Sequence, residues 1–245
     1  MNIDDLQIVV IEDLKDVWQD PDVRELYCDL MQIKLDSYGL VYGDNVVSAD
    51  KADYFGTHLL VCQRGIRLKP IFGYKSITLE KSNEFHLTFP ALSLVKADAH
   101  KDCIDELERI IKGAQQRGES ISFDYSWAQD ANLKEFRTRE MAQKFRDITM
   151  SIGVNHHREY GIEHMITCGV VKVRTDQFFE KMGLQKVSSR SEFPQKDLND
   201  NNVHIFHTKD FSLYGYEVAA KYLDLWEKRI NISSKYKKNL INKAA

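Results

Sequence analysis

The stretch of residues 163–187 constrains the fold most, because it predicts three elements in immediate succession. Residues 164–171 are mostly apolar and β-branched, which is typical of a buried strand. Thr175 can cap the helical segment TDQFFEKM, whose two phenylalanines and methionine would face a core, and Gly183 would end it. Residues 184–187 begin a second strand. The pattern predicts a β-α-β unit, which by itself fits any α/β fold.

The letters FFEKMGL after this strand resemble the "(F/Y)-x-K-x-G-(F/L)" end of the GNAT acyltransferase superfamily. In that superfamily the motif follows the strand beside which the thioester donor lies. The predicted order of elements from Val23 to Val187 resembles a GNAT domain as well. The resemblance implies an α/β (α+β) fold, with a GNAT-like mixed central sheet flanked by helices on both faces and an added C-terminal helix. We expect residues 1–210 to form this domain and residues 211–245 to add the C-terminal helix and a basic tail.

The other elements are predicted from periodicity and from turn and cap residues. Asp20 and Pro21 begin a helix that Gly39 would end. The remaining expectations are a strand or short helix at 6–11, strands at 58–62, 70–79 and 84–89, a helix at 102–112, a strand at 120–125, a long helix from 133 through 160, a strand at 203–207 and a helix at 213–230.

The front half resembles bacterial autoinducer (acyl-homoserine lactone) synthases and the related N-acyl amino acid synthases. The similarity rests on the helix DVRELYCDLMQIKLDSYGL, on two aspartates in the following loop and on the strand THLLV. It implies that the substrate-binding residues on the amine side are Arg24, Asp50, Asp53 and Lys75. For each of them the simpler interpretation is a surface charge.

The acyl donor would meet the start of the long helix, in the sequence FRTREMA. GNAT enzymes usually carry a glycine-rich loop there that approaches the pyrophosphate of coenzyme A, and this sequence has no glycine at those positions. The autoinducer-like enzymes also lack a strict glycine loop and take the acyl group from acyl carrier protein. We therefore expect no permanently bound cofactor, with acyl-phosphopantetheine on acyl carrier protein, or else acyl-CoA, as donor.

The predicted donor-binding residues are Arg137, Thr138, Arg139 and Met141. A basic strip around them would suit a phosphodiester and an acidic carrier protein. The strip contains Lys134, Arg137, Arg139, Lys144 and Arg146. The alternative is an ordinary helix face balanced by neighbouring acids.

The predicted catalytic residues lie on strand 120–125 and just after it. Asp124 would be the general base or the ligand of the substrate amine, because burial on an apolar strand is expected to raise the pKa of a carboxyl group. The alternative is a structural acid that pairs with a helix. The backbone N–H groups of Trp127 and Ala128 would polarise the thioester carbonyl at a bulge that is usual for the resembled fold.

We expect no metal site. His156 and His157 are adjacent, adjacent helix residues diverge, and the sequence offers no third ligand at a suitable spacing. The four cysteines are far apart and indicate reduced thiols in a cytoplasmic protein.

Charge and hydropathy exclude several classes of partner. The formal net charge of −3 gives no general attraction to nucleic acid or to an anionic membrane. The acidic N-terminus is unlike a signal peptide, and no apolar run approaches membrane-spanning length.

Three functions remain open. The first is a GNAT-type N-acyltransferase that passes an acyl chain from acyl carrier protein to a primary amine such as an amino acid, by direct attack with a carboxylate base. The second is an acetyl-CoA-dependent N-acetyltransferase. The third is a catalytically inactive GNAT-like domain that binds a ligand or partner.

Overall fold

The chain divides into two compact units, each assembled from separate stretches of sequence. The computed structural model describes residues 3–43, 46, 49–134 and 138–234. The first unit comprises residues 1–76, 126–149 and 221–245, and the second comprises 77–125 and 150–220. Strand β4 (Ile121–Gln129) and helix α6 (Arg139–Tyr160) each have residues in both units. The expected domain assignment of 1–210 and 211–245 stays a prediction.

The first unit contains a mixed sheet with helices on both faces. Its strands lie in the order β9 (Ile230–Ile232), β1 (Leu6–Ile11), β2 (Thr57–Gln63) and β3 (Lys69–Thr78). Only β9 and β1 are parallel among these neighbours. Every residue of β1 is buried, so this strand has packing on both faces.

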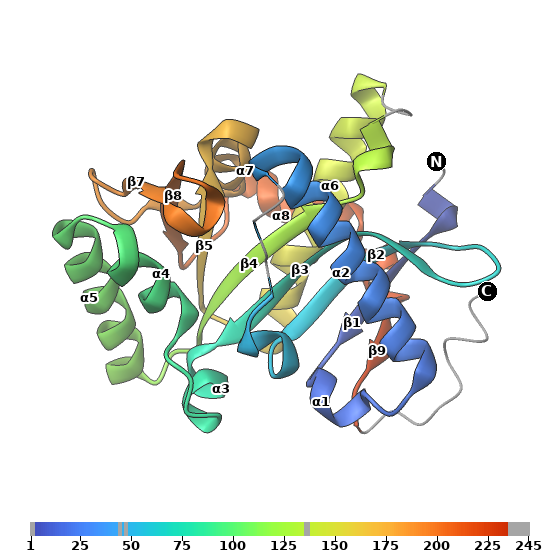
Figure 1. Ribbon diagram of the computed structural model, residues 1–245, viewed down its shortest axis with the longest axis horizontal. Helices are drawn as coiled ribbons and strands as arrows, with labels where there is room; N and C mark the ends of the chain where they lie inside the picture. The colour runs from blue at the N-terminus through green and yellow to red at the C-terminus, as the bar shows by residue number, and fades with distance from the viewer. Residues whose placement is uncertain (1–2, 44–45, 47–48, 135–137, 235–245) are drawn as a thin grey trace. The chain divides into compact units, whose positions relative to one another are not determined.

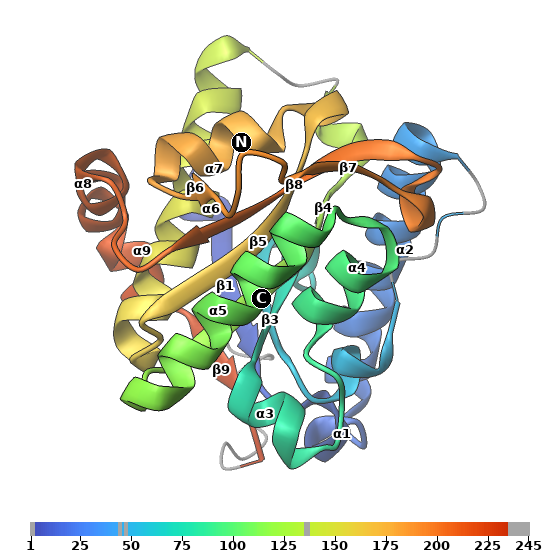
Figure 2. The ribbon, with the colours of Figure 1, turned by 90° about the vertical axis from the view of Figure 1, so that its left-hand side faces the viewer.

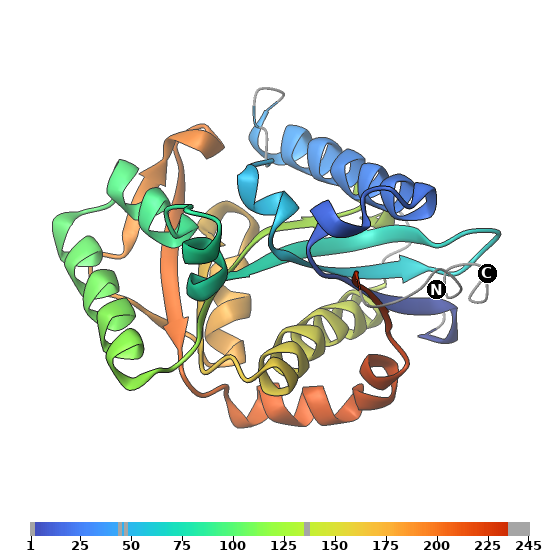
Figure 3. The same cartoon turned by 90° about the horizontal axis from the view of Figure 1, so that it is seen from below.

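Helix α2 (Pro21–Tyr42) covers one face of this sheet, and the first half of α6 covers the other (Figure 3). Because strand residues alternate between faces, neighbouring β3 residues identify the two sides. Gly73 faces α2, where a Cβ would lie 2.5 Å from Cδ1 of Leu30. Phe72 faces α6, and its ring centroid lies 5.8 Å from that of Phe145. The short helices of this unit are α1 (Leu14–Val17) and α9 (Leu223–Glu227).

The strands of the second unit lie in the order β4, β5 (His164–Val170) and β8 (Asn201–Thr208). Strands β4 and β5 are parallel and joined through α6, whereas β5 and β8 are antiparallel. Two short strands, β6 (Gln185–Lys186) and β7 (Glu192–Gln195), both pair with β8. The helices of this unit are α3 (Leu79–Glu84), α4 (Pro90–Asp98), α5 (Lys101–Arg117), α7 (Thr175–Met182) and α8 (Leu213–Lys221). Helices α4 and α5 lie side by side (Figure 2).

The β5–α7–β6 segment confirms the predicted β-α-β unit (Figure 1). Gly169 allows α7 to approach the strand, because a Cβ there would lie 2.8 Å from Cα of Asp176. Gly183 ends α7 with φ 105°, a conformation that favours glycine. The N-cap residue is Arg174 and not Thr175, whose hydroxyl instead accepts a hydrogen bond from the backbone N–H of Val170.

Three predicted elements are wrong. Helix α2 does not end at Gly39 but continues to Tyr42, since a single glycine costs a long packed helix only about 1 kcal/mol. The strand expected at 84–89 is absent: α3 ends at Glu84 and Pro90 begins α4, so alternation alone misled. The C-terminal helix at 213–230 is two helices, α8 and α9, followed by β9. No described helix is both long and apolar enough to cross a membrane.

Candidate functional site

The parallel ladder between β4 and β5 stops before either strand does. It pairs Ile121–Asp124 with His164–Thr167, whereas β4 continues to Gln129 and β5 to Val170. At the last pair the hydroxyl of Thr167 donates a 2.6 Å hydrogen bond to the backbone carbonyl of Asp124. The predicted catalytic aspartate therefore stands at the point where the regular ladder ends.

Asp124 is fully buried, and its carboxylate contacts a hydroxyl and an imidazole. The hydroxyl of Ser122, on the same face of β4, donates to Oδ1 at 2.8 Å. The Nε2 atom of His157, from α6, lies 3.1 Å from Oδ2 and 3.3 Å from the Ser122 hydroxyl. Phe211 packs edge-on against the His157 ring, with centroids 5.6 Å apart. A carboxylate, an imidazole and a hydroxyl thus contact one another in the interior of the second unit.

The geometry also corrects the argument against a third ligand near the two histidines. His156, His157 and Asp124 are all buried, and each offers a ligand atom within 4.8 Å of the other two. Sequence spacing missed this arrangement because the third group comes from a strand 32 residues away from His156 along the chain.

The β4 backbone is irregular where a bulge was expected. Ser126 has φ 62°, which is uncommon for a residue other than glycine and is a form of strain often seen at functional sites. Trp127 and Ala128 follow it directly. Trp127 stacks on Tyr74 with centroids 3.9 Å apart and planes at 3°, and it also lies beside Phe72. Ala128 is buried.

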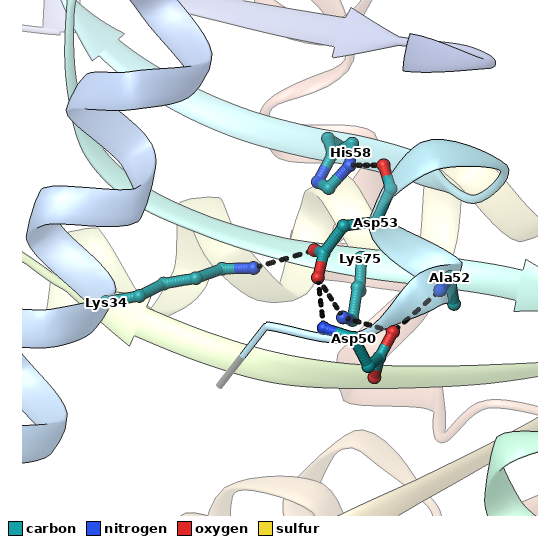
Figure 4. A network of polar contacts seen from close by, with 6 residues as sticks. All are labelled: Lys34, Asp50, Ala52, Asp53, His58 and Lys75. Carbon is teal, nitrogen blue, oxygen red and sulfur yellow. Dashed lines mark hydrogen bonds and ion pairs between the residues drawn. The ribbon is translucent and has the colours of Figure 1, made fainter. Parts of the chain in front are cut away.

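Three of the four predicted amine-side residues meet in a second polar network, within the first unit (Figure 4). Asp53 is buried, and its carboxylate oxygens lie 3.4 Å from Nζ of Lys34 and 2.8 Å from Nζ of Lys75. Lys75 also pairs with Asp50 at 2.9 Å. Asp50 is the accessible member, since 45% of its side chain is exposed while both lysines are fully buried.

The loop carrying these acids is shaped by its own hydrogen bonds. Asp50 and Asp53 form a capping box around the short helix η2 (Lys51–Tyr54), in which Asp53 accepts from the backbone N–H of Asp50 at 2.7 Å. His58 on β2 contacts the backbone carbonyl of Asp53 through Nε2 at 2.7 Å, so that nitrogen carries the proton. The network thus ties α2, η2, β2 and β3 together.

Burial and charge shift the pKa values in this network. Burial lowers the pKa of Lys34 to about 8, although Asp53 opposes the shift. Burial lowers the pKa of His58 to about 4, helped by the charge of Lys34. For Asp53, burial alone would raise the pKa, but the charges of Lys34 and Lys75 together outweigh it and the pKa falls. At neutral pH the network therefore holds an ionised Asp53, a mostly charged Lys34 and a neutral His58 imidazole.

Arg24 lies apart from this network, on the same helix as Lys34 but ten residues earlier. At 1.5 Å per residue that separation is about 15 Å along the axis. The structure therefore does not bring Arg24 to the two aspartates.

At the predicted donor side, α6 begins at Arg139, and the hydroxyl of Thr138 accepts from the backbone N–H of Met141 at 3.2 Å. Thr138 and Arg139 are exposed. Arg137 lies outside the described residues.

Sequence reasoning missed Lys34, His58, Ser122 and His157. The helical spacing held a signal for Lys34, which follows the buried Leu30 by one turn and so falls on the inward stripe of α2. Ser122 lies two residues before Asp124 on the same strand, so strand alternation held a signal for it. His157 was considered only as half of a metal pair, because its contact with Asp124 spans 33 residues along the chain.

No protein-family model matches the chain, and neither does any curated protein. Among solved structures the chain is similar to FeeM, an N-acyl amino acid synthase from uncultured soil microbes, with 12% identity, 83% of this chain and 90% of that chain covered and a TM-score of 0.50. It is also similar to the AHL synthase LasI (12% identity, 96% and 98% covered, TM-score 0.47) and to a polyamine N-acetyltransferase from Drosophila melanogaster (14%, 83% and 100%, 0.45).

The last two likenesses have TM-scores below 0.5 and carry no argument. The first, at 12% identity, concerns the fold alone. Together with the mixed sheet, the β-α-β unit and the interrupted β4–β5 ladder, it shows that the chain has a GNAT-like acyltransferase fold.

Proposed function

We propose that the protein is an N-acyltransferase that transfers an acyl chain from acyl carrier protein to a primary amine such as an amino acid. The observation that carries the proposal is the position of Asp124: a fully buried carboxylate at the end of the β4–β5 ladder, in a fold similar to that of an N-acyl amino acid synthase. A ladder that stops before its strands do gives an extended donor arm backbone groups to bind.

Asp124 acts as the general base in this proposal. It accepts a proton from the ammonium group of the acceptor, and the free amine attacks the thioester carbonyl. The new N–C bond forms, the C–S bond breaks, and the thiolate leaving group takes up a proton, with no covalent enzyme intermediate. Ser122 and His157 hold the carboxylate in a fixed orientation.

The backbone N–H groups of Trp127 and Ala128 polarise the carbonyl in this scheme. Donors fixed before the reaction stabilise the developing oxyanion without reorganisation. The strained φ of Ser126, one residue earlier, supports the assignment, since a local change of backbone direction redirects the next N–H groups.

The donor's phosphodiester is assigned to the start of α6, with Arg137, Thr138, Arg139 and Met141. The helix dipole favours an anion at a helix N-terminus, and the N–H of Met141 is already bonded to the Thr138 hydroxyl. The lack of glycine in FRTREMA favours a single phosphodiester over a pyrophosphate that must be closely wrapped, and so favours acyl carrier protein over coenzyme A.

On the amine side we assign contact with the acceptor to Asp50. Its side chain is half-exposed, while Asp53 and Lys75 are buried and position it. An exposed carboxylate suits the ammonium group of an amine. Arg24, ten residues before Lys34 on α2, lies too far from Asp50 to contact the same small acceptor.

The test supplies purified protein with acyl-acyl carrier proteins of graded chain length, the matching acyl-CoA esters, acetyl-CoA and a panel of amino acids and polyamines. Mass spectrometry should detect an N-acyl amino acid formed from the carrier-protein donor. An acetylated product from acetyl-CoA alone would support the acetyltransferase instead. No turnover with any donor, together with ligand binding that survives Asp124→Asn, would support the inactive binding domain.

The matched control for Asp124→Asn is Asp147→Asn, which removes another buried carboxylate, on α6. Asp147 accepts a 2.7 Å hydrogen bond from Gln143 and has no role in the proposed chemistry. Loss of turnover in both variants would indicate a folding defect and count against Asp124 as the base.

A further inference from the structure

The cluster of Asp124, His156 and His157 has the composition of a metal site. We propose that these three side chains bind a divalent transition-metal ion of the zinc class. The three residues are 0%, 1% and 2% exposed, and their ligand atoms all lie within 4.8 Å of one another. Two imidazoles and one carboxylate are the donor set that zinc and its neighbours prefer, and three protein ligands leave a fourth position for water.

Helix α6 explains how two adjacent histidines can serve one ion. Every residue of α6 from Asp147 to His157 is buried, so the helix is covered on all sides in this stretch. Both histidines therefore point into protein, and their rings lie 5.7 Å apart at 79°. Asp124 reaches the pair from β4. Although neighbouring helix residues diverge, a ligand atom of each histidine still lies within 4.8 Å of the Asp124 carboxylate.

The ligand atoms of the three side chains would have to move only a short way to coordinate one ion. Four ligands around zinc, with bonds of about 2.0–2.1 Å, lie about 3.4 Å from one another. Asp124 Oδ2 and His157 Nε2 already lie 3.1 Å apart. The cluster's limit of 4.8 Å means that no other pair needs to close by more than about 1.4 Å, which side-chain rotation can supply.

Metal binding would replace a proton and leave the supporting contact in place. The ion would take the position of the proton between His157 and Asp124, since a ligating imidazole and carboxylate must both offer a lone pair. Ser122 would continue to donate to the other carboxylate oxygen, and a hydrogen bond of this kind orients a metal-bound carboxylate. The same atoms thus serve either a shared proton or a metal ion.

One consequence rests on the proposed function. If Asp124 is the general base, a bound ion occupies the lone pair that would accept the proton of the amine, so zinc would inhibit acyl transfer. The binding itself does not depend on that function, and it is measured without any substrate.

The binding test titrates Zn²⁺ or Co²⁺ alone into the full chain, followed by calorimetry and by the visible spectrum of Co²⁺. The protein carries Cys28→Ser throughout, because Cys28 is an exposed thiol that could bind metal by itself. We expect about one equivalent to bind, with affinity reduced at least tenfold by His156→Gln and by Asp124→Asn. A matched control is His207→Gln, which alters a different histidine pair: His207 Nε2 lies 2.9 Å from Nδ1 of His164.

Unchanged affinity in His156→Gln, an equal loss in His207→Gln, or no binding of one equivalent would overturn the proposal. If His156→Gln does not fold, the Co²⁺ spectrum of the parent protein decides. Bands of a four-coordinate nitrogen and oxygen site support the assignment, whereas thiolate-to-cobalt charge transfer refutes it. Binding with normal affinity but without effect on turnover would sustain the metal site and count against Asp124 as the base.

Discussion

Asp53 in the first unit and Asp124 in the second are both almost completely buried, and their side chains have different kinds of partner. In the first unit, Asp53 lies between two buried lysines. In the second, Asp124 lies between a hydroxyl and an imidazole. Asp53 is 1% exposed and Asp124 is 0% exposed, so the two aspartates do not differ in burial. The difference lies in what their partners can do with a proton.

Lysine partners fix the charge of a buried carboxylate. Two ammonium groups lower the pKa of Asp53 despite its burial, and with Asp50 they give a network of two positive and two negative charges. In such a network the loss of a fully buried member is costly, because it leaves other buried charges without a partner. The partners of Asp124 include a hydroxyl and an imidazole and, unlike those of Asp53, no lysine among the contacts described above. This is the setting in which we propose a general base and a metal ligand. The first network suits a framework role and the second a chemical one.

The largest expected effect is on turnover in Asp124→Asn. Removing a general base costs about 10²–10⁴ in rate, and the isosteric amide keeps the side-chain shape. The far-ultraviolet circular dichroism spectrum should be unchanged, while the rate of N-acyl product formation falls. A variant that retains more than half of the parent rate would remove Asp124 from the chemistry.

Asp53→Asn should instead cause a large loss of folding stability. It leaves Lys34 and Lys75 buried without their shared carboxylate, and breaking a buried ion pair costs about 3–5 kcal/mol. Urea denaturation followed by tryptophan fluorescence measures the change.

The control for that experiment is Asp50→Asn, which breaks an ion pair on the half-exposed side of the same network and should cost less than about 1 kcal/mol. Equal costs for the two variants would contradict the framework role of Asp53.

Acid should destabilise the protein through His58. Its pKa is about 4 in the folded protein and about 6.5 when unfolded, so the unfolded chain binds more protons between these values. The free energy of unfolding therefore falls as the pH drops from about 6.5 to about 4, by at most about 3 kcal/mol from this residue. Urea denaturation at several pH values should show a flatter dependence for His58→Gln than for the parent, whereas the exposed His100→Gln should follow the parent.

Ser122→Ala should have the smallest effect. It removes one buried hydrogen bond to Asp124, worth about 1 kcal/mol, and leaves the His157 contact in place. We expect a modest loss of stability and a shift in the pH profile of turnover, because the carboxylate loses a donor that favours its charged form. A pH profile identical to that of the parent would show that Ser122 does not influence the base.

Local sequence rules predicted much of the fold. The β5–α7–β6 unit, the strands β2 and β3 and the helix start at Asp20 all follow from short-range patterns of apolar spacing, caps and glycine stops. The errors occurred where local signals compete. At 84–89 an alternating pattern suited a strand, but the hydroxyl of Thr78 caps α3, and Pro90 begins α4 shortly afterwards.

The candidate site was predicted in part. Asp124 stood out because a carboxylate in an apolar strand must find partners. Asp50 and Asp53 came from resemblance alone, and their meeting with Lys75 is consistent with a shared site. Of the partners that distinguish the two aspartates, Lys34 falls on the inward stripe of α2, whereas no local pattern pairs His157 with Asp124.

By itself, the sequence determined which segments form helices and strands and which faces are apolar, because those properties depend on neighbours within a turn or two. Only the tertiary structure decided that Asp53 meets lysines while Asp124 meets a histidine and a serine. The pKa of a buried acid depends on groups within a few ångströms. Lys34 and Lys75 lie 19 and 22 residues from Asp53 along the chain, and His157 lies 33 residues from Asp124, whereas Ser122 is only two residues away. The chemistry of the two aspartates is therefore set by packing across the fold, which no local pattern encodes.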